Sequence, residues 1–326
     1  MTAVWIPDHS SVQAFRENPE AFRLKYRLNL VPAVPDDKMR AGSAIHAGRN
    51  VLYEARKQGA TAYDDATIAE AVRVARAHRG ELGGFRDANH VERIVRAYAV
   101  RYAVEPFEVV ANEEYVQALV GMDAEGACVD CLRSALTNTP FAGSCEVCHA
   151  FWYCGIMDCA KRYPDESEYV MDTKTTGSYL SEAWHGTMSL ADQMTGYVAL
   201  RRALHRCDGY YVDGVHISDY VPKRGAAEPK IDLEKDFVRV GPVRVPEWRV
   251  ERWARDLRYT LAQIAELERT RGIDMPWPIY QNWAYGKVDA YREFYEQPAE
   301  LHASVAAMFE KREWSPRSVA EERAVK

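Results

Sequence analysis

Two apolar runs separated by a polar turn form the clearest pattern near the middle of the chain. Residues 151–157 (FWYCGIM) and 168–171 (EYVM) are mostly apolar, whereas residues 161–167 (KRYPDES) contain the types that interrupt strands. Short apolar runs bounded in this way predict a β-hairpin. The predicted strand ends carry three charged residues: Asp158 after the first run, and Asp172 and Lys174 after the second.

Periodic patterns on both sides of this hairpin predict further helices and strands. Apolar side chains recur at helical spacing over residues 39–58, 64–80, 87–104, 192–205, 246–271 and 298–312, and in a first pair of helices capped by Ser10–Ser11 and divided at Pro19. Strand patterns cover residues 107–110, 115–120 and 210–217, and a second hairpin pairs 237–240 with 243–245 around Gly241–Pro242. Together they predict an α/β fold, with a central mixed sheet of four or five strands and helices on both sides.

The same patterns divide the chain into three regions. We expect a helical N-terminal region over residues 1–106, which carries His46, and a core over residues 107–220. An insertion at 121–150 interrupts the core, and residues 221–326 form a C-terminal hairpin and helical extension. The length of 326 residues suits one large or two modest domains.

The hairpin gathers groups that suit a divalent metal. Residues two apart in a strand share a face, so Asp172 and Lys174 point the same way, and strand pairing brings Asp158 close. Two carboxylates are good ligands for Mg²⁺ or Mn²⁺, and a neighbouring lysine can orient an attacking water. On spacing alone, two solvated strand-end carboxylates and a surface lysine remain an equal alternative.

Four cysteines in the insertion have the spacing of a structural zinc site. Cys128 and Cys131 are separated from Cys145 and Cys148 by thirteen residues, and such paired CxxC motifs close a thiolate tetrahedron. We expect residues 132–144 between them to form a loop. Disulfides are the alternative, which the expected reducing compartment disfavours. His149 and Cys154 lie near enough in the sequence to be substitute ligands.

Composition describes an ordinary globular chain without a global basic field. Hydrophobic residues make up 47% and charged residues 28%, and the net charge is -6, so attraction to nucleic acid must come from local patches and bound cations. The basic helices predicted over 64–104 are either solvated faces or a surface that follows phosphates. There is no membrane-length apolar run and no signal-like N-terminal pattern, so we expect a cytoplasmic protein with no membrane partner.

The spacing around the hairpin resembles a known nuclease active site. Gly155-x-x-Asp158 followed by Asp172-Thr173-Lys174 is similar to the motif of the PD-(D/E)XK nuclease superfamily. The resemblance implies a restriction-endonuclease-like core, and it spans roughly residues 8–220. It favours the metal-site interpretation over the solvated turn.

Further motifs narrow the resemblance to the RecB-like branch, which includes CRISPR adaptation nucleases and phage exonucleases. Gly42-x-x-x-His46 upstream is similar to the branch's G-x-x-x-H element, and Gln193-x-x-x-Tyr197 downstream is similar to its Q-x-x-x-Y helix motif. Asn18 stands where some members carry a cysteine, and residues 282–291 contain none. Because four thiolates normally hold an iron–sulfur cluster, we expect no such cluster, with aromatic residues (Trp277, Tyr280, Trp283 and Tyr285) closing the chain ends.

The resemblance also implies roles for the matched residues. His46, Asp158 and Asp172 hold Mg²⁺ or Mn²⁺, with the Thr173 carbonyl as a further ligand, and Lys174 positions or activates the water. On the helix that follows, Gln193 and Tyr197 support the site and touch the substrate. Glu113 is the match to a glutamate that often enters the preceding strand, and its role is left open.

The function implied is a metal-dependent DNA nuclease. We expect an exonuclease that prefers single strands or free ends, acting in phage or mobile-element recombination, repair or CRISPR adaptation, with protein partners from those pathways. A catalytically inactive, zinc-containing nucleic-acid-binding or scaffold protein is the alternative.

Overall fold

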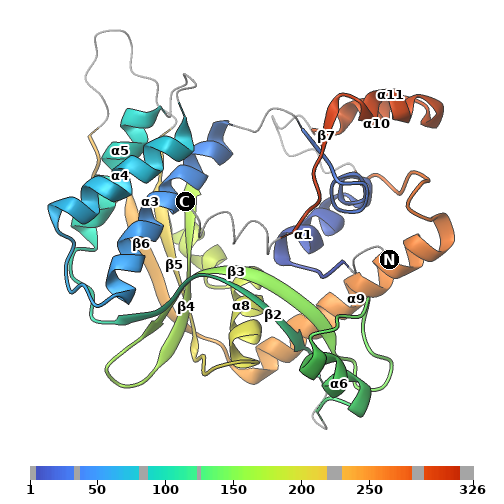
Figure 1. Cartoon of the computed structure of the whole chain (residues 1–326), viewed down its shortest axis with the longest axis horizontal. Coiled ribbons are helices and arrows are strands. Elements are labelled where there is room, and N and C mark those ends of the chain that lie inside the picture. Colours follow the sequence, from blue (N-terminus) through green and yellow to red (C-terminus); the bar gives the residue numbers. More distant parts are fainter. Residues whose placement is uncertain are drawn as a thin grey trace. The chain divides into compact units, whose positions relative to one another are not determined.

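The computed structural model describes residues 5–32, 37–80, 87–122, 126–218, 230–280 and 290–315 (Figure 1). The chain forms two compact units. We call them the sheet unit (Pro35–Val116 and Ile156–Pro246) and the terminal unit (Met1–Val34, Gln117–Gly155 and Glu247–Pro316), in each case for the residues that the structure describes. The expected division into three regions stays a prediction.

A five-stranded sheet in the order β2-β3-β4-β5-β6 forms the centre of the fold. Its strands are β2 (Glu108–Val120), β3 (Phe151–Arg162), β4 (Glu168–Thr176), β5 (Gly209–His216) and β6 (Phe237–Arg244). β4 pairs with β3 in antiparallel and with β5 in parallel orientation, and β6 is antiparallel to β5. The crossover from β4 to β5 contains α7 (Glu182–Met188) and α8 (Asp192–Arg202). The predicted mixed α/β sheet is therefore confirmed.

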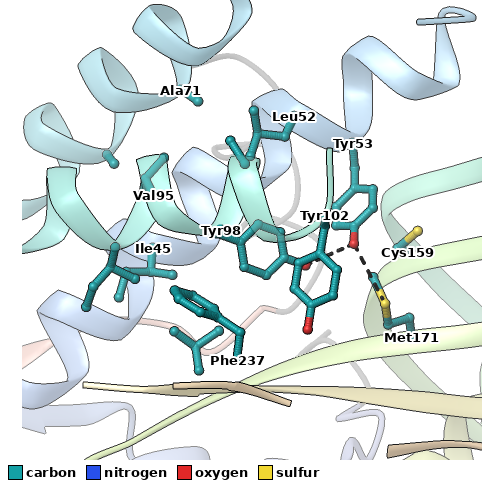
Figure 2. Packing of buried hydrophobic residues seen from close by; sticks show 14 of the residues in the cluster. Ile45, Leu52, Tyr53, Ala71, Val95, Tyr98, Tyr102, Cys159, Met171 and Phe237 are labelled. Carbon is teal, nitrogen blue, oxygen red and sulfur yellow. Dashed lines mark hydrogen bonds between the residues drawn. The ribbon is translucent and has the colours of Figure 1, made fainter. Parts of the chain in front are cut away.

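Helices α3 (Asp37–Lys57), α4 (Asp65–Arg79) and α5 (Ala88–Arg101) cover one face of this sheet. Their apolar sides pack with alternate strand residues into one buried core, which Figure 2 shows around Tyr53, Tyr98, Met171 and Phe237. The hydroxyls of Tyr53 and Tyr98 lie 2.9 Å apart within it. Helix α8 packs on β4 and β5 from the other face of the sheet, where its Gln193 accepts a hydrogen bond from Lys174 of β4. The site residues on β4 thus stand between two helical layers.

The β3–β4 hairpin forms as predicted, but β3 does not end at Asp158. It continues to Arg162, because Lys161 is buried beneath the rings of Phe107 and Tyr211, 4.3 and 4.4 Å from their centroids. Arg162 then pairs with Glu168 across the strands at 2.7 Å. Charged residues that find partners thus extend the strand beyond the apolar run.

β2 is one strand rather than the two short strands expected. It runs through residues 112–114 without a break, and Glu113 within it has a φ of 48°. A left-handed residue in a strand re-aims its side chain without ending the pairing. The polar residues in this segment therefore mark a local distortion and not a connection.

The predicted second hairpin around Gly241–Pro242 is wrong, since residues 237–244 form the single strand β6. Tyr210 pairs with Val243 and Val212 with Val240, so two residues of β6 stand opposite one residue of β5. Gly241 takes a φ of 126° there and lies against Tyr211. The residues that the sequence predicted as a turn instead form a β-bulge, and glycine is needed there because of this φ.

The terminal unit holds the first and last helices, α1 (His9–Glu17), α2 (Pro19–Phe22), a π-helical turn η1 (Arg23–Arg27), α9 (Glu247–Arg271), α10 (Arg292–Glu296), η2 (Ala299–Leu301) and α11 (His302–Ala306). α2 begins at Pro19 as expected. The cap of α1 is Asp8 and not serine, because its carboxylate accepts the Ser11 N–H at 2.8 Å. A long last helix is wrong: Phe309–Lys311 forms β7, which pairs with β1 (Leu30–Pro32).

Aromatic packing joins the two chain ends within this unit. The Trp277 ring stacks on Phe22 at 6.0 Å and meets Phe15 edge-on at 6.4 Å. Asn18 donates from its amide to the Tyr295 hydroxyl at 3.1 Å. Tyr280 is half exposed, and the other two aromatics expected here, Trp283 and Tyr285, lie outside the described residues.

Candidate active site

A close approach between α3 and β4 positions the histidine of the site. A Cβ on Gly42 would lie 2.7 Å from the Thr175 hydroxyl oxygen, so only glycine lets the helix come this near the strand. One turn further along α3, Nδ1 of His46 lies 3.3 Å from Oδ2 of Asp158. The Gly42-x-x-x-His46 spacing therefore has a steric reason as well as a chemical one.

Asp158 is buried and held from three directions. The Thr173 N–H donates to its Oδ2 at 2.8 Å, and Nη1 of Arg49 lies 3.2 Å from the same oxygen. Burial alone raises the pKa of the Asp158 carboxyl, but Arg49 and His46 outweigh it and hold that pKa well below its ordinary value. The carboxylate is therefore ionised and fixed, as a metal ligand must be.

Glu113 reaches the same place from β2. Its positive φ turns the side chain toward α3, where Oε1 lies 3.6 Å from Nη2 of Arg49. The fully buried Arg49 guanidinium also donates to the Thr173 hydroxyl at 2.6 Å. A residue held in a sparsely populated backbone region at such a point is a frequent mark of a functional site.

His46, Glu113 and Asp158 form a group that fits a divalent ion. One ligand atom from each lies within 4.8 Å of the other two. Ligands of Mg²⁺, each about 2.1 Å from the ion, are about 3.0 Å apart when adjacent and about 4.2 Å apart when opposite, so the three atoms would draw together around one ion. Two carboxylates and one imidazole suit Mg²⁺ or Mn²⁺ better than a soft metal.

Lys174 heads a second chain of contacts beside this group. Its ammonium lies 2.6 Å from Oδ2 of Asp172 and donates to the Gln193 amide oxygen at 2.6 Å. The Gln193 amide in turn donates to the Tyr197 hydroxyl at 2.9 Å. Burial raises the pKa of Asp172 more than Lys174 lowers it. Helix α8 thus fixes the lysine through two side chains on one face.

The structure assembles the predicted residues in two linked sets rather than one. His46 and Asp158 meet directly, whereas Asp172 faces Lys174 and is not part of the three-residue group. Thr173 joins the sets, because its amide bonds Asp158. Ligation by Asp172 and by the Thr173 carbonyl stays a prediction.

Sequence reasoning missed one member of the site and left another without a role. Arg49 contacts Asp158 and Thr173, and the available signal was its position three residues after His46, on the same helix face. Glu113 was noted but given no role, because nothing in the sequence indicates the distortion of β2 that turns it toward His46 and Asp158.

The four cysteines of the terminal unit form a second group. Their sulfur atoms all lie within 4.8 Å of one another, with Cys128 and Cys145 3.7 Å apart. Backbone N–H groups of Cys148 and Val147 lower the pKa of Cys145 to about 6, which favours its thiolate, whereas burial raises the pKa of Cys131. Cys154 is not a member, since its sulfur lies 3.8 Å from the Ile6 carbonyl.

The connection between the CxxC pairs is not the loop expected. Residues 129–137 form helix α6 (Val129–Thr137), which begins directly after Cys128 and buries Cys131. The Trp152 indole N–H donates to the Ser134 hydroxyl at 3.0 Å, and Trp152 joins a small core with Cys131, Cys148 and Leu119. This packing explains the helix, since a loop would leave the core open.

The α/β fold and the grouped side chains are those expected of a metal-dependent nuclease, and the comparison with protein families agrees. The family model of the PD-(D/E)XK nuclease superfamily matches residues 9–272, and the chain belongs to that superfamily. A search of curated proteins finds no match. Within the described ranges, no helix combines the length and apolar character needed to cross a bilayer.

Proposed function

We propose that the protein hydrolyses phosphodiester bonds of DNA with Mg²⁺ or Mn²⁺ bound by His46, Glu113 and Asp158. The observation that carries this is the 4.8 Å grouping of these three side chains beside an ordered lysine. A bound divalent ion would polarise the phosphate and lower the pKa of a water. Asp172 either completes the ligand set or orients Lys174.

The side chains around this group would divide the remaining work. Lys174, fixed by Asp172 and Gln193, would position the attacking water and offset phosphate charge. Gln193 and Tyr197 would hold that lysine and touch the substrate. Arg49 would keep the Asp158 carboxylate ionised and lie beside Glu113 without leaving the core.

A RecB-like exonuclease that prefers single strands or free ends is the finer proposal. Its support is the set of motifs around Gly42, His46, Gln193 and Tyr197, together with the α7 segment beside β5. Recombination, repair or CRISPR adaptation in a phage or mobile-element setting, with protein partners from those pathways, would use such an activity.

For the cysteine group we propose one Zn²⁺ with a structural role. Four thiolates are a closed ligand set, and two of them, Cys131 and Cys148, are buried in a small core. A closed set of four ligands leaves no position for substrate. Zinc would therefore stabilise the terminal unit and take no part in hydrolysis.

End-labelled and circular DNA, single- and double-stranded, test the proposal. We expect cutting with Mn²⁺ or Mg²⁺, none with EDTA, and none by Lys174→Ala. A preference for ends leaves circles intact. Binding without metal-dependent cutting would instead support the inactive nucleic-acid-binding alternative, and no binding at all a scaffold.

A further inference from the structure

An exposed tyrosine stacked on a fixed histidine lies near the candidate site. The Tyr179 ring centroid is 5.2 Å from that of His216, with 30° between the ring planes. Tyr179 is 82% exposed, whereas the His216 side chain is 10% exposed. One face of the tyrosine is therefore supported, and the rest of the ring is open to solvent. We call this pair the aromatic platform.

The histidine of the platform is held in place from the side and from the backbone. The ring Nδ1 of His216 lies 2.8 Å from Oδ1 of Asp236, and the backbone N–H of His216 donates to the Asp236 carbonyl at 2.9 Å. The other carboxylate oxygen of Asp236 accepts the Asp232 N–H at 2.8 Å. An anchored imidazole restricts the motion of the tyrosine ring that lies on it. Less conformational entropy of the tyrosine is therefore lost when a base binds.

The platform is close to Lys174 and on the same face of the sheet. Lys174 pairs with Gly214, and Thr176 with His216, in the parallel register of β4 and β5. Alternate residues share a face. Two residues along a strand, about 6.6 Å, and one strand spacing of about 4.8 Å at right angles to it place the backbone positions of Lys174 and His216 about 8 Å apart. About two stacked nucleotides, at about 3.4 Å each, span that distance.

The segment that follows Tyr179 packs closely on the sheet. A Cβ on Gly214 would lie 2.6 Å from the Trp184 ring and 2.8 Å from Leu180. These side chains hold the segment that carries Tyr179 directly against the strand next to Lys174. Tyr179 itself remains outside this packing, so core formation does not account for its position.

We propose that Tyr179, supported by His216, stacks an unpaired nucleobase of the strand whose phosphate meets the candidate site. This inference rests on the proposed function and specifies its substrate. Base stacking on an aromatic ring tolerates any sequence because every base has a π-face. Internal base pairs in a duplex hide those faces, so the platform selects single strands and frayed ends.

Substitutions of Tyr179 test the platform on the intact protein. With single-stranded DNA, Tyr179→Ala should raise KM about tenfold with little change in kcat. Tyr179→Phe should behave as wild type, since the ring and not the hydroxyl is required. Tyr259→Ala, which removes a 69% exposed tyrosine from α9, is the matched control and should change nothing.

An abasic scan separates stacking from general damage. Wild-type cutting should fall when one abasic nucleotide is placed about two positions from the cut, and Tyr179→Ala should be insensitive to it. An equal effect of the abasic nucleotide on the wild type and on Tyr179→Ala would overturn the aromatic platform, and so would an unchanged KM of Tyr179→Ala. In either case, cutting by the wild type would still support the proposed nuclease. Absence of wild-type cutting overturns the proposed function itself. Thermal melting confirms that each variant is folded.

Discussion

The protein carries two candidate metal groups that are built in opposite ways. The four cysteines come from 21 consecutive positions, 128–148, and form a closed, all-sulfur set. His46, Glu113 and Asp158 come from a helix and two strands, and they form a harder set that leaves coordination positions open. The first arrangement is typical of structural metal sites, whereas the second is typical of sites that bind water and substrate.

The two groups also differ in what balances their charge. Without metal, the carboxylates of the open group have a buried cation, Arg49, 3.2 Å from Asp158 and 3.6 Å from Glu113. The thiol group has backbone N–H donors around Cys145 instead. We therefore expect the sheet unit to fold without metal and the cysteine group to depend on it.

The largest expected effect is on the open group. Asp158→Asn removes the charge of a proposed ligand and should reduce metal-dependent cutting on the order of a thousandfold, with the fold retained. Asp165→Asn, in the exposed turn of the same hairpin, is the control and should cut normally. Rates on labelled DNA measure both, and comparable activity of the two variants would remove Asp158 from the site.

Loss of a thiolate should act on stability rather than on chemistry. Cys131→Ala should abolish zinc binding and lower the free energy of unfolding by about 3 kcal/mol or more. Metal analysis and thermal melting measure these effects. Cys207→Ala, a buried cysteine outside the group, should keep its zinc. Equal zinc content in all proteins would exclude the cysteine group as the zinc site.

Glu113→Gln tests the residue whose ligand position follows from the fold. It should raise the Mn²⁺ concentration needed for half-maximal cutting by on the order of a hundredfold, because one of two carboxylates is lost. Glu108→Gln, an exposed position on the same strand, is the control. A metal requirement unchanged by Glu113→Gln would leave Asp158 and Asp172 as the carboxylate pair.

Acid should weaken the sheet unit through the buried pair of Asp213 and Arg239, which lies next to the open group because Asp213 is opposite Thr173 in the sheet register. Burial opposes ionisation of Asp213, but Arg239 prevails and lowers its pKa to about 2. Because the pKa of Asp213 is lower in the folded protein, its ionisation stabilises the fold at pH values above the pKa of about 4 that it has in the unfolded chain. This stabilisation, about 2 kcal/mol, is lost as the pH falls toward 2. Asp213→Asn should therefore flatten the acid limb of a stability–pH profile. An unchanged limb would contradict the assignment.

The difference between the two groups also sets how far the sequence could predict them. Cysteine spacing is a local feature of the sequence, so the positions of the four cysteines were enough to predict the sulfur group. The hairpin and mixed sheet followed from apolar runs, but the length of β3 did not, because aromatic rings far apart in sequence bury Lys161. Glu113 and Arg49 enter the site through a strand distortion and a helix packing that no local pattern encodes.

A crystal grown with Mn²⁺ tests the central claim most directly, because anomalous scattering locates the ion independently of any variant. We predict one peak at ~2 Å from ligand atoms of His46, Glu113 and Asp158. A Mn²⁺ ion bound elsewhere on the sheet unit, with these three side chains free of metal, would contradict the account.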